Sequence, residues 1–185
     1  MSVDQLHGWA ANIPLFKGLD AADLDAVMKN SRTVTYAVDQ NICTQDDPSN
    51  GLYILLSGKL RAYIFSGILG GAAQVLSELS PGQHVGAMGL IDSGKFSASV
   101  DAIESSEVLF IPAFHFLDLL ETYPKFAKCV IDSLCDILNS QKNLIIKSKN
   151  ASLIKDKKLA PILPNMKMLC SIIRMNNNNI AMKVR

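Results

Sequence analysis

The chain has 185 residues and a formal net charge of +1 at pH 7, and 49% of its residues are hydrophobic while 19% are charged. This length and composition are typical of a globular protein with one sizeable core and an appendage. No stretch approaches the roughly 18 apolar residues of a membrane span, and the first residues do not resemble a secretion signal. We therefore expect a cytoplasmic protein with no membrane partner.

The charge is distributed unevenly along the chain. Residues 1–141 contain 8 Lys and Arg against 16 Asp and Glu, whereas residues 142–185 contain 10 Lys and Arg against a single Asp. An acidic body with a basic end indicates that the end meets nucleic acid or another acidic surface. A solvated tail is the alternative that a charge run by itself leaves open.

The cysteines indicate reduced thiols. The chain has four of them, at Cys43, Cys129, Cys135 and Cys170. Their spacing is not that of metal ligands, and a disulfide framework would be denser in a smaller domain. We expect no metal site.

The predicted elements begin with helices and continue with strands. Asp20 is the expected N-cap of a short helix that buries Leu24, Val27 and Met28. From residue 31 to residue 112, short β-type runs alternate with turn residues such as Pro81-Gly82. Eight short strands at this spacing predict an antiparallel barrel or jelly roll. The expected strands are 32–36, 41–44, 51–57, 59–65, 73–79, 83–86, 97–102 and 107–111.

Helical periodicity returns after Pro112. A helix over 113–122 is expected to end at Tyr123-Pro124, and a longer helix over 125–149 follows. Its apolar content exceeds one narrow stripe, so we also expect it to pack on the strands. One stripe recurs in steps of three and four, as in a coiled-coil seam, at Ile131, Leu134, Leu138, Gln141, Ile145 and Ser148. This pattern predicts a homodimer through the 125–149 helix, with a core helix of a monomer as the alternative.

Four motifs, in this order along the chain, resemble those of transcription regulators of the CRP/FNR type. They are IPLFKGL at 13–19, GLYILLSGKL at 51–60, LSPGQHVGAMGL at 79–90 and SASVDA at 97–102. The resemblance implies a mainly β fold with flanking helices: a cyclic-nucleotide-binding-like double-stranded β-helix (jelly roll) followed by a long dimerisation helix. It divides the chain into a β-roll with N-terminal helices at 1–122, the dimerisation helix at 123–150, and the truncated start of a DNA-binding domain, a linker plus first helix, at 151–185.

The same resemblance implies a ligand pocket. A short helix beginning near Gly86 would direct backbone N–H groups at an anionic phosphate. The implied contacts to the phosphate side are Gly86, Ala87, Met88, Gly89, Ser97 and Ala98. The purine side would be formed by Ala62, Leu76, Gln141 and Lys142, although apolar residues there would be core in any β-roll and Gln141 could instead set the register of the seam.

Two anchors of the family's pocket are replaced in this chain. Ala87 stands where the family has a glutamate for the ribose, and Phe96 stands where it has an arginine for the phosphate. Lys95 precedes Phe96, but an ammonium group cannot reproduce the bidentate fork of a guanidinium. We expect weak binding of cyclic AMP or none, so the effector is a weakly bound cyclic nucleotide or another small anion.

The remaining candidates for chemistry are few. His84 lies at the edge of the implied pocket, where a single histidine is more typical of a surface residue than of a haem ligand. The sequence shows no catalytic dyad or triad, so we expect no enzyme. The chain also ends before a recognition helix could follow, which predicts only non-specific contacts with DNA. The leading hypothesis is an effector-sensing module of a CRP/FNR-like regulator with a degenerate pocket, and the alternative is a ligand-independent, regulatory-subunit-like scaffold domain.

Overall fold

The computed structural model describes residues 8, 12–65, 73–92 and 94–150, with side chains up to residue 139. The chain divides into two compact units, residues 1–135 and residues 136–185. The predicted start of a DNA-binding domain at 151–185 lies outside the described residues. Within the described part, no helix is both long and apolar enough to cross a membrane.

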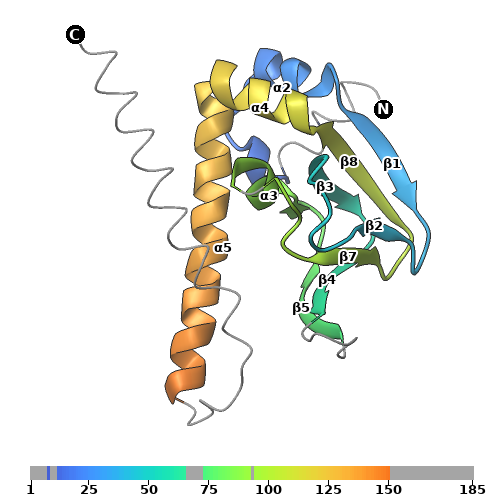
Figure 1. Ribbon diagram of the computed structural model, residues 1–185. Coiled ribbons are helices and arrows are strands. Elements are labelled where there is room, and N and C mark those ends of the chain that lie inside the picture. Colours follow the sequence, from blue (N-terminus) through green and yellow to red (C-terminus); the bar gives the residue numbers. More distant parts are fainter. Residues whose placement is uncertain (1–7, 9–11, 66–72, 93, 151–185) are drawn as a thin grey trace. The chain divides into compact units, whose positions relative to one another are not determined.

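Eight strands form two four-stranded antiparallel sheets, as the spacing of the turns predicts (Figure 1). The strand orders are β1-β8-β3-β6 and β2-β7-β4-β5, so most neighbours, except β4 and β5, are not consecutive in the sequence. This arrangement confirms the predicted jelly-roll-like fold with flanking helices. The strands are β1 (Arg32–Tyr36), β2 (Asn41–Cys43), β3 (Gly51–Ser57), β4 (Leu60–Phe65), β5 (Ala73–Leu79), β6 (His84–Val85), β7 (Ser99–Ala102) and β8 (Ser106–Pro112).

The side-chain pattern of each strand matches its place in a sheet. In β4, Leu60, Ala62 and Ile64 are buried while Arg61 and Tyr63 are partly exposed, so one face of this strand is covered. In contrast, β3 is buried continuously over its first five residues because it lies between β8 and β6. The apolar faces of both sheets contribute to one core cluster, which consists of Ile42, Cys43, Tyr53, Leu55, Leu60, Ala62, Leu79, Phe96, Val100, Ala102, Val108 and Phe110.

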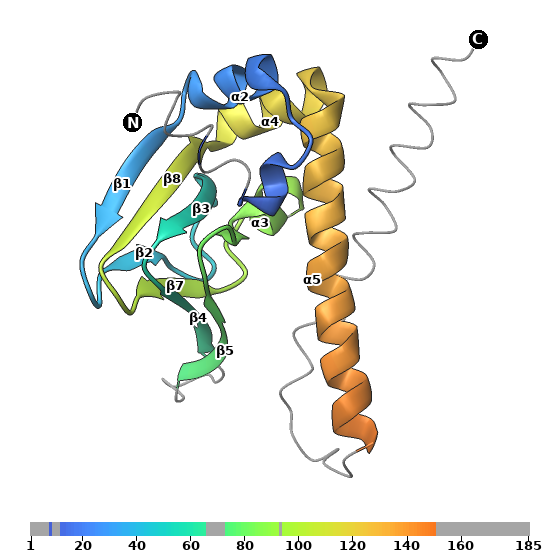
Figure 2. The same ribbon diagram turned by 180° about the vertical axis from the view of Figure 1, so that it is seen from behind.

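Helices α2 (Ala21–Met28) and α4 (Ala113–Thr122) lie at one end of β1 and β8, and the first turns of α5 (Pro124–Asn150) lie along one side of the β-roll (Figures 1 and 2). Asp20 caps α2 as predicted: its side chain accepts from the backbone N–H of Asp23, and the Asp23 side chain accepts from the backbone N–H of Asp20. This reciprocal pair satisfies two amides that the helix leaves free. The helices are a 3-10 turn η1 (Pro14–Phe16), α2 (Ala21–Met28), α3 (Ala87–Ile91), α4 (Ala113–Thr122) and α5 (Pro124–Asn150).

The first half of α5 packs on the β-roll unit. Phe126, Val130 and Leu134 recur every four residues and are all at least 96% buried. Leu134 is thus part of the chain's own core, although the sequence pattern also places it on the predicted dimer seam. Phe126 meets Phe116 of α4 edge to face, with ring centroids 6.0 Å apart. The apolar stripe therefore joins α5 to α4 and the strands.

The Phe116–Phe126 contact gives a stability prediction with a control on the same helix. Phe116 is completely buried, whereas Phe114, two residues earlier, is 66% exposed. Removing a buried phenylalanine ring leaves a cavity, so Phe116→Ala should lower the free energy of unfolding by about 3–5 kcal/mol. Phe114→Ala should change it by less than about 0.5 kcal/mol. Urea denaturation of both variants tests this, and equal losses would contradict the described packing.

Candidate ligand-binding site

We call residues 86–97, the segment that the resemblance implies to bind a phosphate, the cassette. It starts at Gly86, which no other residue could replace without strain. Gly86 precedes α3 with φ at 100°, in the left-handed region. A Cβ at Gly86 would also overlap the carbonyl oxygen of Gly51 on β3. At Gly89, a Cβ would overlap the carbonyl oxygen of Lys95. Both glycines therefore allow close backbone contact, which fixes α3 against β3 and against the end of the cassette.

The second half of the cassette is held by the turn at residues 46–49. The backbone N–H of Phe96 donates to Asp47 O at 3.0 Å, and that of Asp46 donates to Phe96 O at 2.9 Å. Ser49 N donates to Gly94 O at 2.7 Å. These bonds bracket Phe96 on both sides, so its side-chain direction is set by the backbone.

Phe96 points into the protein. Its side chain is 5% exposed and belongs to the core cluster between the sheets. Its ring lies 6.2 Å from that of Tyr53, which in turn lies 4.9 Å from that of Phe110. The Arg32 guanidinium covers the Phe110 ring at 4.4 Å. An aromatic ring packed with other aromatic rings thus occupies the position at which the resemblance implies an arginine.

The other predicted phosphate-side residues differ in exposure. Ala87 is 2% exposed and Gly89 is buried, while Met88 and Ala98 are partly buried. Ser97, the residue with a hydroxyl suited to an anion, is exposed. The described residues of the segment therefore present the exposed hydroxyl of Ser97 and apolar side chains. Its charged residues, Asp92 and Lys95, are both exposed.

The predicted purine-side residues are placed in two regions. Ala62 is buried and pairs with Val100 and Ser77 across its two neighbouring strands. Leu76 lies at the register shift between β4 and β5 and is 48% exposed. Gln141 and Lys142 lie in α5, and their side chains fall outside the described ones. The structure thus brings Ala62 to the core and leaves Leu76 accessible.

His84 is a site residue that the sequence pattern missed. It lies in β6, opposite Ile54 of β3, and its Nε2 is 2.8 Å from Ser133 Oγ on α5. Its Nδ1 is buried and has no hydrogen-bond partner. His84 is therefore partly buried and in contact with α5, whereas the sequence pattern is typical of a surface residue. The sequence signal for a contact between His84 and α5 is the apolar stripe of the long helix, which predicts packing on the strands.

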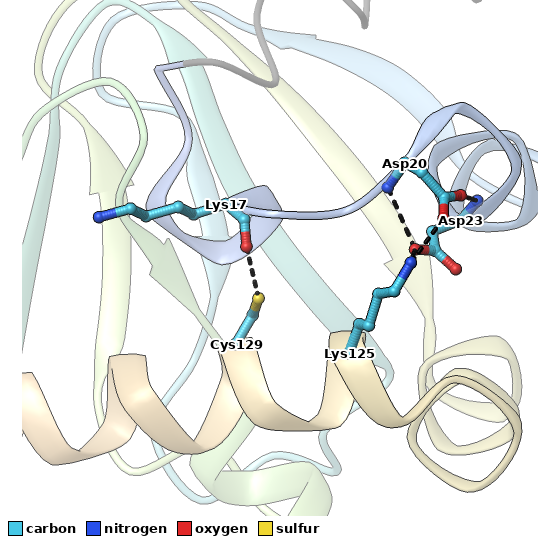
Figure 3. Close-up of polar contacts among 5 residues, drawn as sticks. All are labelled: Lys17, Asp20, Asp23, Lys125 and Cys129. Carbon is cyan, nitrogen blue, oxygen red and sulfur yellow. Dashed lines mark hydrogen bonds and ion pairs between the residues drawn. The ribbon is translucent and has the colours of Figure 1, made fainter.

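Three polar side chains, spaced four residues apart along α5, contact the β-roll unit, and Figure 3 shows the first two, Lys125 and Cys129. The Lys125 ammonium lies 2.5 Å from Asp20 Oδ2 and 3.1 Å from Asp23 Oδ2. One turn further, the Cys129 thiol donates to Lys17 O at 3.1 Å, and Ser133 then meets His84. We call Lys125, Cys129 and Ser133 the polar stripe.

No group of three or more His, Cys, Asp and Glu side chains is arranged to hold a metal ion in the described ranges. Burial raises the pKa of the Cys43 thiol to about 12, so this thiol stays protonated in the core. Cys43, Cys129 and Cys135 are free thiols.

Residues 33–123 match the family of the cyclic nucleotide-binding domain. The cyclic AMP receptor protein of Thermus thermophilus is 35% identical over 114 residues, which are 62% of this chain and 52% of that protein. Glutaminase 2 of Bradyrhizobium diazoefficiens is 29% identical over 124 residues, which are 67% of this chain and 19% of the enzyme. The chain thus spans about half the length of the first relative and a fifth of the second.

Solved structures agree with the sequence matches. The Thermus thermophilus catabolite activator protein has a TM-score of 0.63 and 32% identity, over 73% of this chain and 63% of that chain. The sensor domain of the transcriptional regulator DNR from Pseudomonas aeruginosa has a TM-score of 0.64 over 77% of this chain and 95% of that one. Its identity is 18%, so it supports the fold alone.

Residues 33–123 therefore resemble a cyclic nucleotide-binding domain in sequence and in fold. The predicted resemblance to regulators of the CRP/FNR type is confirmed.

Protonation of His84 provides a prediction for the pH dependence of stability. Burial lowers the pKa of His84 to about 4, below the value of about 6.5 in an unfolded chain. The neutral ring is favoured by folding, so its contribution is complete above pH 6.5 and is lost as the pH falls toward 4. Between pH 7.5 and pH 5.0 the linkage is about 2 kcal/mol in the free energy of unfolding.

The measurement compares urea unfolding of the wild type and His84→Gln at both pH values. Glutamine keeps an N–H donor near Ser133 and does not titrate. The decrease in stability should be smaller by about 2 kcal/mol in His84→Gln than in the wild type. The same decrease in both proteins would show that His84 is not buried as described.

Proposed function

We propose that the chain is a non-enzymatic, effector-sensing module of a CRP/FNR-like transcription regulator, in which the pocket has lost its two strongest ligand anchors. The β-roll with its N-terminal helices would be the sensor, and α5 would be both the dimerisation helix and the output. The observation that supports the altered pocket is the burial of Phe96 among Tyr53 and Phe110.

A phosphate inside a protein needs donors because its desolvation is costly. Removing one partner of a buried, hydrogen-bonded charge pair costs about 2–5 kcal/mol, and 2 kcal/mol corresponds to about 30-fold in affinity. Lys95 does not compensate, because it is exposed and bonds through its backbone to the turn at Pro48. Among the described residues of the cassette, the groups left for an anion are the hydroxyl of Ser97 and backbone amides.

The replaced anchors should lower the affinity for cyclic nucleotides. Titration calorimetry of the wild type with cyclic AMP and with cyclic GMP should give dissociation constants weaker than about 10 micromolar. The double variant Ala87→Glu/Phe96→Arg should bind cyclic AMP at least about 30-fold more tightly, because it restores one acceptor and one bidentate donor. Wild-type binding tighter than about 10 micromolar would contradict the proposal.

A matched control separates the restored charge from loosened packing. Phe96→Leu keeps an apolar residue in the core and adds no donor, so its affinity should equal that of the wild type. Circular dichroism confirms that each variant is folded. If the folded double variant does not bind either nucleotide, the ligand-independent scaffold becomes the better description.

The proposed dimer rests on α5. The helix extends to Asn150, whereas its buried stripe on the β-roll unit ends at Leu134. Beyond that point Ile137 and Leu138 are partly exposed, and the sequence continues the predicted seam. An amphipathic helix with an uncovered apolar stripe gains stability by pairing with a second copy.

Sedimentation analysis tests the dimer. At a protein concentration of about 50 micromolar, the wild type should sediment as a dimer of about 40 kDa, because association of the two helices increases with concentration. Leu138→Lys places a charge on the seam and should give the monomer of 20.1 kDa. Asn139→Lys, at the exposed neighbouring position, should remain dimeric. A wild-type monomer at this concentration would overturn the dimer.

A further inference from the structure

His84 lies at the junction between the cassette and the output helix. It is two residues before Gly86, on the short strand that leads into α3. Its ring bonds Ser133 in the third turn of α5. A displacement of α5 away from β6 must therefore break this bond, and a displacement of β6 must break it as well.

The hydrogen bond fixes which ring nitrogen carries the proton. If Ser133 donated to Nε2, the proton would be on Nδ1, and a buried N–H would have no acceptor. Orphaned buried N–H groups are rarer than orphaned acceptors. The favoured form is the one in which Nε2–H donates to Ser133 Oγ and Nδ1 keeps a lone pair. A second proton on Nδ1 would place an unpaired positive charge in a dry environment.

The other two contacts of the polar stripe differ from this one. Lys125 and Asp20 are both more than half exposed, and exposed ion pairs contribute little to stability. The thiol of Cys129 is a weak donor. Of the three contacts of the polar stripe, the bond between His84 and Ser133 is thus the one that involves a partly buried, titratable ring.

We propose that the His84–Ser133 hydrogen bond is a proton-sensitive latch, which holds the first half of α5 against the strand leading into the cassette. The inference rests on the proposed role of α5 as the output helix. Protonation of His84 favours release of α5, because the imidazolium is hydrated only when α5 no longer covers it.

The charges around His84 do not oppose this behaviour. Burial alone lowers the pKa of His84, with no contribution from a charged neighbour. On β3, Tyr53 donates its hydroxyl proton to Asn50. On α5, Asp132 is paired with Lys128 at 2.5 Å. The titratable and charged side chains of β3, α3 and the neighbouring turns of α5 are Tyr53, Lys128, Cys129, Asp132 and Asp136.

The size of the effect follows from proton linkage. The ring has a pKa of about 4 when covered and about 6.5 when hydrated. Lowering the pH from 7.5 to 5.5 therefore shifts the equilibrium toward the released helix by about tenfold. A released α5 loses its tertiary packing, and an isolated helix is only marginally stable in water. Its backbone amides then exchange with solvent.

Hydrogen exchange of the full chain without any effector tests the latch. After correction for the intrinsic rates, the protection of amides in residues 125–135 should fall about tenfold between pH 7.5 and pH 5.5, relative to amides of β3 and β8. His84→Gln should abolish this pH dependence. Ser133→Ala keeps the histidine but removes its partner, and should lower the protection of the same amides already at pH 7.5.

Three results would overturn the latch. They are an equal pH response in wild type and His84→Gln, unchanged α5 protection in Ser133→Ala at pH 7.5, and an equal loss of protection in β3, β8 and α5. Ser133→Ala keeps the test decisive if His84→Gln does not fold. Because no nucleotide is present, failure of the latch is distinguishable from failure of the proposed pocket, which calorimetry measures. Sedimentation at both pH values separates release of α5 from dissociation of a dimer.

Discussion

The contact of Phe96 with Tyr53 holds the cassette closed onto the β-roll. Phe96 follows α3, Tyr53 lies at the centre of β3, and Phe110 on the adjacent β8 continues the aromatic packing. Aromatic pairs contribute about 0.5–1.5 kcal/mol beyond the burial of their surface. The backbone bonds between Phe96 and the turn at residues 46–47 keep the ring in this position.

The same contact stabilises the fold, and it is the basis of the weakened pocket that we propose. In a pocket with an arginine at position 96, the buried charge would be costly until an anion arrived. A phenylalanine avoids that cost in the absence of ligand and adds apolar contacts to the core. In the proposed function, Phe96 therefore adds to the stability of the unliganded β-roll at the expense of ligand affinity. Ala87, 2% exposed at the start of α3, would have the same effect on the ribose side.

The strands and helices were predictable because their patterns are local. Alternation along β4, the Asp20 cap and the Pro124 break each depend on neighbouring residues, and the structure has all three. The direction of Phe96 and the burial of His84 were not predictable in this way. They depend on contacts across 43 and 49 positions, with Tyr53 and Ser133 respectively. The residues around His84 give no local sign that a distant helix contacts it.

Helix α5 is attached to the β-roll unit by two stripes with different physical character. The apolar stripe of Phe126, Val130 and Leu134 is stabilised by burial, which does not depend on protonation. The polar stripe beside it adds contacts that depend on charge, on a weak thiol donor and on one buried imidazole. Only the polar stripe can change with the ionic conditions, and Ser133 is its member next to the cassette. Because Leu134 follows Ser133 directly, release of the latch exposes the end of the apolar stripe first. The apolar stripe thus holds the helix in place, and the polar stripe allows its release to depend on pH.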